Sequence, residues 1–103
     1  MATTVTLHNT SLSNGGACTC NDAHVQGPAG KTGTQTIQSE QTANWDLSAL
    51  GWDPYEGQEF EVAAICSGSS NWRHSTKFVY KLDTNYQYNW QGPSANPKIV
   101  GPM

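Results

Sequence analysis

The sequence predicts an all-β fold, an antiparallel β-sandwich of seven to eight short strands in one domain over residues 1–103. Three observations support this prediction. Apolar and polar residues alternate with period two along most of the chain. The alternating segments recur roughly every ten residues, and Gly, Pro, Asn and Asp stand between them. A small closed barrel is the alternative that the same pattern allows.

The first third of the chain predicts three strands separated by turn residues. Val5 and Leu7 alternate with polar neighbours, which is typical of a strand with one buried face. An Asn-Gly pair predicts a hairpin turn, and a Gly/Pro cluster ends the second extended stretch. The expected elements are strands at 4–8, 17–25 and 33–38, with turns at 14–16 and 27–30.

The middle segment, 39–50, is the best place for any helix. Asp46 could cap one helical turn that Gly51 ends, and a strand followed by a turn fits the same residues equally well. Trp45 stands beside Leu47 and is expected in the core. Trp52 and Tyr55 flank a proline turn, where they could be either buried or exposed.

The last part of the chain contains the clearest strands. Phe60, Val62, Ala64 and Cys66 are expected on one face, and Glu59, Glu61, Ala63 and Ile65 on the other. The remaining expected elements are strands at 77–82, 86–91 and 98–100, with a turn at 83–85 and loops at 67–70 and 92–97.

Composition excludes several classes of protein. Five Lys and Arg residues and a net charge of −3 are too few positive charges for nucleic-acid binding. No apolar run reaches the ~20 residues of a membrane span. The N-terminus lacks a charged start followed by an apolar stretch, so we expect a cytoplasmic protein without signal peptide, or a secreted one if a signal was removed.

The three cysteines leave three alternatives open. Cys66 could form one disulfide with Cys18 or Cys20, or all three could be free thiols. A zinc site would take these cysteines and His24, although one residue between the first two thiols is not the usual spacing.

No catalytic motif is present, and we expect no enzymatic activity, no cofactor and no metal. The sequence lacks a nucleophile elbow, a metalloprotease motif and a phosphate-binding loop. Glu59 and Glu61 point the same way on one strand and could in principle act as an acid–base pair, but a solvated strand face is the expectation.

Carbohydrate binding suits this composition best. Sugars need planar hydrogen-bonding groups for their hydroxyls and aromatic rings for their C–H faces. Two clusters combine both, and the predicted sugar-binding residues are Trp72, Arg73, His74, Asn89, Trp90 and Gln91.

Each cluster also has a structural interpretation. Trp72 could cap the end of the sandwich, and His74 could be a solvated loop histidine. Trp90 continues a stripe with Tyr86 and Tyr88, which could be core or a dimer interface.

A second functional hypothesis is a membrane-lipid-binding or cytolytic defence protein. Aromatic-rich loops on an acidic sandwich could enter a lipid headgroup layer. Without a basic patch, such binding would depend on neutral headgroups.

The run from Gln38 through Trp45-Asp46-Leu47-Ser48-Ala49-Leu50-Gly51 and Glu56-Gly57-Gln58-Glu59-Phe60 to Phe78-Val79-Tyr80 is similar in style to the small α-galactosyl-binding lectins of mushroom fruiting bodies. This resemblance covers roughly residues 35–100. It implies a cytosolic defence lectin for terminal galactose-type sugars, often a homodimer. Shallow single sites bind near millimolar, about −4 kcal/mol, so useful avidity also requires a homo-oligomer.

Overall fold

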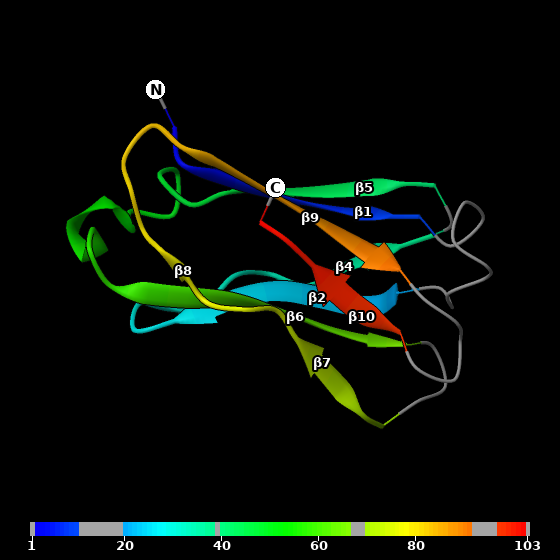
Figure 1. Ribbon diagram of the computed structural model, residues 1–103. Helices are drawn as coiled ribbons and strands as arrows, with labels where there is room; N and C mark the ends of the chain where they lie inside the picture. Colours follow the sequence, from blue (N-terminus) through cyan, green and yellow to red (C-terminus); the bar gives the residue numbers. More distant parts are fainter. Residues whose placement is uncertain (1, 11–19, 39, 67–69, 92–96, 103) are drawn as a thin grey trace.

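The chain forms a β-sandwich of two sheets that do not close into a barrel (Figure 1). This computed structural model describes residues 2–10, 20–38, 40–66, 70–91 and 97–102. The predicted all-β sandwich is therefore confirmed. The predicted turn at 14–16 lies outside the described residues, as do most of the predicted loops at 67–70 and 92–97.

The first sheet, sheet A, has the strand order β10-β9-β1-β5. Strand β1 (Thr4–Asn9) lies between β5 (Thr42–Asp46) and β9 (Asn85–Gln91), and β10 (Lys98–Val100) pairs with β9. The β1–β9 pair is parallel, in contrast to the antiparallel pairing expected throughout. Strands β1 and β9 are about 80 residues apart in the sequence. No local pattern encodes whether two such distant strands pair parallel or antiparallel.

The second sheet, sheet B, has the order β3-β2-β6-β7, and β4 and β8 pair with β2 and β6 respectively. A 3-10 turn, η1 (Asp53–Tyr55), precedes β6 at one end of the sandwich. The strands of this sheet are β2 (Cys20–Gly27), β3 (Gly30–Lys31), β4 (Gln35–Ile37), β6 (Glu59–Cys66), β7 (Trp72–His74) and β8 (Phe78–Val79).

The core lies between the two sheets and is rich in aromatic rings. Along β9, Tyr86, Tyr88 and Trp90 are buried, and the residues between them are exposed or half-buried. Phe78 of sheet B packs on Tyr86 with ring centroids 4.3 Å apart. The period-two stripe of β9 is therefore core, and the alternative of a dimer interface on this stripe is wrong.

The segment 39–50 contains no helix in its described part. Residues 42–46 form β5, with Ala43 and Trp45 facing the core, and 47–51 form a turn. The expected core position of Trp45 is confirmed, and its Nε1–H donates to the carbonyl of Gly33 at 3.0 Å. Trp52 is also buried, where it stacks on Phe60.

No helix of the described residues is long and apolar enough to cross a membrane.

Cys66, at the end of β6, is disulfide-bonded. The alternative of three free thiols is therefore wrong, and the sulfur of Cys66 is not available as a zinc ligand. Cys18 and the side chain of Cys20 lie outside the described part of the chain.

Asn9 links the two sheets from inside the core. Its side chain is fully buried, and Nδ2 donates to the carbonyl of Ile37, at the end of β4, at 2.9 Å. Its backbone N–H donates to Gln41, and its carbonyl accepts from Glu40. The hydrogen bonds of Asn9 thus connect β1 of sheet A to the end of β4 in sheet B and to the residues that follow it.

Replacing Asn9 by Ala is expected to lower the free energy of unfolding by about 1–3 kcal/mol, because the buried carbonyl of Ile37 loses its donor. Urea unfolding measures this difference. Asn44→Ala, at an exposed position of β5, is the matched control and should change stability by less than about 0.5 kcal/mol. Equal losses in the two variants would contradict the account of Asn9.

The hydroxyl of Tyr88 is buried and has no hydrogen-bond partner within the described part of the chain. Burial raises the pKa of Tyr88 to about 12 from its ordinary value of 10.0. The unfolded chain therefore releases this proton at lower pH than the folded protein does, and the free energy of unfolding falls as the pH rises from 10 to 12.

Tyr88→Phe is expected to be neutral or stabilising by up to about 1 kcal/mol at pH 7, since it removes an unpaired polar atom. The variant should also lose less stability than the wild type between pH 7 and pH 11, measured by chemical unfolding at both values. Tyr80→Phe is the control and should destabilise at pH 7, because the Tyr80 hydroxyl donates to Asp53 at 2.6 Å. An alkaline loss as large in Tyr88→Phe as in the wild type would refute this interpretation.

Candidate functional site

The structure places the two predicted clusters on different sheets. Trp72, Arg73 and His74 form β7 at an edge of sheet B, where a loop was expected, whereas 89–91 belong to β9 in sheet A. Trp90 has no exposed surface, so its indole cannot stack on a sugar and this part of the predicted site is wrong. The buried alternative for Trp90 is the one that the structure shows.

Asn89 and Gln91 are half-buried on the opposite side of β9 from Trp90. Asn89 lies in register between His8 of β1 and Val100 of β10. Because Trp90 points into the core, these two residues are left without the aromatic ring that the sequence associated with them.

The register of β7 separates the three residues of the other cluster. Trp72 lies opposite Ile65 and His74 opposite Ala63, on the outer face of sheet B. Arg73 lies opposite Ala64, whose side chain faces the core, so Arg73 points away from that outer face. Trp72 and His74 therefore share a surface, and the expectation that Arg73 joins them is wrong.

Three further strands bring polar residues to the same outer face. In one row across the sheet, Ala63 of β6 has His24 of β2 on one side and His74 on the other. In the next row, Glu61 pairs with Gln26. Lys31 of β3 pairs with Gln26 from the far side of β2.

A chain of hydrogen bonds joins these side chains. His24 Nε2 lies 2.9 Å from Gln26 Oε1, and Gln26 Nε2 donates to Glu61 Oε2 at 2.7 Å. The same carboxylate oxygen lies 3.0 Å from His74 Nδ1. Four side chains from three strands are thus held in fixed orientations relative to one another.

The carboxylate of Glu61 determines where the protons lie. An ionised carboxylate can only accept, so the amide NH₂ of Gln26 must face Glu61 and its oxygen must face His24. His24 then carries its proton on Nε2, and His74 carries one on Nδ1. In neutral His24 the other ring nitrogen, Nδ1, is a bare acceptor.

That acceptor is buried. His24 is only 5% exposed, and its Nδ1 has no hydrogen-bond partner among the residues that the structure describes. The edge-to-face contact with Trp72, at 5.2 Å between ring centroids, covers the imidazole. Trp72 itself is 40% exposed, so a large apolar ring stands at the surface beside a buried, unpaired polar atom.

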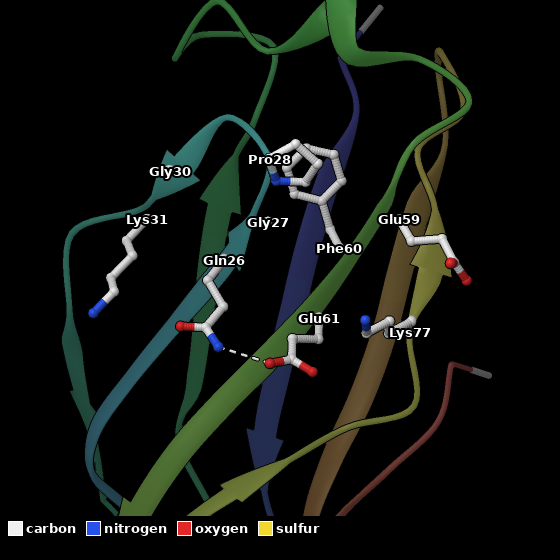
Figure 2. Close-up of a pocket in the computed structure, with 9 residues that line it drawn as sticks. All are labelled: Gln26, Gly27, Pro28, Gly30, Lys31, Glu59, Phe60, Glu61 and Lys77. Carbon is white, nitrogen blue, oxygen red and sulfur yellow. Dashed lines mark hydrogen bonds between the residues drawn. The ribbon is translucent and has the colours of Figure 1, made fainter.

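Two adjoining hollows open on this face. The first, the Trp72 hollow, has a volume of about 280 Å³ and is lined by His24, Gln26, Lys31, Ala63, Trp72 and His74. The second, the Phe60 hollow, has a volume of about 510 Å³ and is shown in Figure 2. Its lining residues are Gln26, Gly27, Pro28, Gly30, Lys31, Glu59, Phe60, Glu61 and Lys77.

The bonded pair Gln26 and Glu61 lies in the middle of Figure 2, with Lys31 on one side and Glu59 and Lys77 on the other. At the end of β2, the ring of Phe60 lies directly against the backbone of Gly27. A Cβ at Gly27 would come within 2.2 Å of that ring. A glycine is therefore required at this position for the Phe60 ring to pack, buried, beneath the end of β2.

The arrangement favours reversible binding of a polar ligand. It offers carboxylate and imidazole acceptors, amine and amide donors, and an exposed indole within one shallow surface. The described residues contain no group of three or more side chains placed to hold a metal ion.

The sequence did not predict His24, Gln26 and Lys31 as parts of the site. The alternation in 59–66 correctly placed Glu61 on the outer face, where a solvated surface was expected. The pairing of β2 with both β3 and β6 is what collects these residues, and the sequence predicted neither partner.

The chain matches no family model, and no curated protein or solved structure is significantly similar to it. The physical properties of the site are therefore the basis for its functional interpretation.

The proton positions derived above can be measured by long-range ¹H–¹⁵N NMR of the imidazoles at pH 7.5. We expect His24 to carry a proton on Nε2, because Gln26 offers that nitrogen only an acceptor. Gln26→Ala removes that acceptor and should let both neutral tautomers appear. A proton on Nδ1 of His24 in the wild-type protein would contradict the assignment.

Proposed function

We propose that this protein is a carbohydrate-binding protein, a lectin without enzymatic activity, whose site is the outer face of sheet B. One observation supports the proposal most. An indole that is 40% exposed lies beside a hollow whose planar polar side chains are already fixed by mutual hydrogen bonds. Such preorganisation lowers the entropic cost of binding a ligand that carries many hydroxyl groups.

In the proposed complex, the C–H face of a sugar stacks on Trp72. Its hydroxyls donate to Glu61, hydrogen-bond the Nε2 of His74 and accept from the amine of Lys31. The Nδ1 of His24 becomes available when Trp72 shifts over the bound sugar, which would give the buried acceptor its missing donor. The proposed site therefore includes Trp72 and His74, which the sequence predicted, together with Glu61, Lys31 and His24.

The class of sugar and the biological role rest on the sequence resemblance. We propose terminal galactose-type glycans as ligands and a role in defence, as in the small mushroom lectins that the sequence resembles. A shallow single site of this kind binds weakly, so we further propose that the protein acts as a homo-oligomer, which multiplies weak sites into useful avidity.

A glycan array followed by inhibition with free sugars tests the proposal. Wild-type protein should bind a group of glycans, and Trp72→Ala should lose at least about tenfold in affinity because the stacking surface is gone. The matched control is Leu82→Ala, which removes a similarly exposed apolar side chain elsewhere and should bind as the wild type does.

Thermal unfolding of both variants separates binding from folding. A cooperative transition of Trp72→Ala near that of the wild type, with binding lost, supports the site. If Trp72→Ala unfolds, His74→Ala tests the site instead. His74 is half-exposed, so its replacement should weaken binding without unfolding the protein. Dye leakage from phosphatidylcholine vesicles that free sugars do not inhibit would favour the lipid-binding alternative and contradict the proposal.

A further inference from the structure

The two hollows on sheet B adjoin each other. Gln26 and Lys31 line both of them. Along β2 and the turn after it, the lining runs from His24 to Pro28. The extended part, His24 to Gly27, spans roughly 10 Å, which is longer than a single pyranose ring.

The Phe60 hollow repeats the chemistry of the Trp72 hollow with different residues. Pro28 and the bare backbone of Gly27 supply an apolar surface above the buried ring of Phe60. Glu59 and Lys77 supply an acceptor and a donor on the side away from Lys31. Each hollow therefore presents an apolar area bordered by groups that can bind hydroxyls.

The polar groups of the Phe60 hollow are free to bind a ligand. Among the described residues, Glu59, Lys31 and Lys77 form no ion pair or side-chain hydrogen bond. Glu61 uses Oε2 for both Gln26 and His74, and its Oε1 has no such bond. Glu61 thus lines the Phe60 hollow and bonds His74 of the Trp72 hollow through Oε2, and its Oε1 remains available to a ligand.

We infer that the two hollows are two subsites of one groove and that the ligand is an oligosaccharide of which the terminal sugar and the adjoining residue both bind. One ring stacks on Trp72, and the adjoining ring occupies the Phe60 hollow between Lys77, Glu59 and Lys31. Glu61 Oε1 accepts from a hydroxyl near the linkage between them. This inference rests on the proposed carbohydrate binding and specifies its ligand class.

Isothermal titration with glycans of increasing length tests the inference. The probes are β-1,4-linked galactose oligomers of one to four residues, with the corresponding cello-, manno- and chito-oligosaccharides as parallel series. In the series that binds, affinity should rise at least tenfold from the monosaccharide to the trisaccharide and then level off, because the groove is filled.

Three variants locate the second subsite. Lys77→Gln and Glu59→Gln should each lower the affinity for the trisaccharide by a larger factor than the affinity for the monosaccharide. The matched control, Lys81→Gln, removes a lysine charge outside both hollows and should leave both affinities as in the wild type. Because residues 59 and 77 lie at exposed positions, these variants are expected to fold.

These affinities distinguish a failure of the two-subsite groove from a failure of the proposed lectin function. A monosaccharide that binds as tightly as its trisaccharide would overturn the two-subsite groove and leave the proposed lectin function intact. Equal losses for both ligands in Lys77→Gln and Glu59→Gln would also overturn it, since the hollows would then form one subsite. The absence of binding to every length in all four series would overturn both the groove and the carbohydrate-binding function.

Discussion

The carboxylate of Glu61 is the group on which the outer face of sheet B depends. It accepts hydrogen bonds from Gln26 and His74 on one oxygen, and through Gln26 it also sets the proton position of His24. Because a carboxylate only accepts, these orientations do not alternate between equivalent states. Fixed orientations favour ligand binding, because these side chains have little conformational entropy left to lose when a ligand binds.

Glu61 can occupy this position only because its neighbours in β6 are in the core. Phe60 and Val62 face sheet A, and the strand alternation turns Glu61 outward between β2 and β7. The same alternation brings Trp72 and His74 to the outer face and turns Arg73 away from it. The site is thus a consequence of how the two sheets pack, and it requires no separate loop scaffold.

The period-two pattern was sufficient to predict the fold class and the two faces of β6, because burial on one face of a strand leaves a local signature. It was insufficient for Trp90, where the same stripe is consistent with core, interface or ligand platform until its partner sheet is known. Strand β7 is three residues long, too short to show a period, and was therefore expected as a loop. His24 appeared only as a zinc-ligand candidate, since its companions Gln26 and Glu61 meet it through pairing between strands that are distant in the sequence.

The central claim is that ligand binds on the outer face of sheet B, and an NMR titration with the tightest-binding glycan tests it most directly. The account predicts that the largest shifts fall on the Trp72 indole N–H, the imidazoles of His24 and His74, and the side-chain amide of Gln26. It also predicts that His8 and Asn89, on sheet A, do not respond. Shifts confined to His8 and Asn89, with the Trp72 signal unchanged at saturation, would contradict the account.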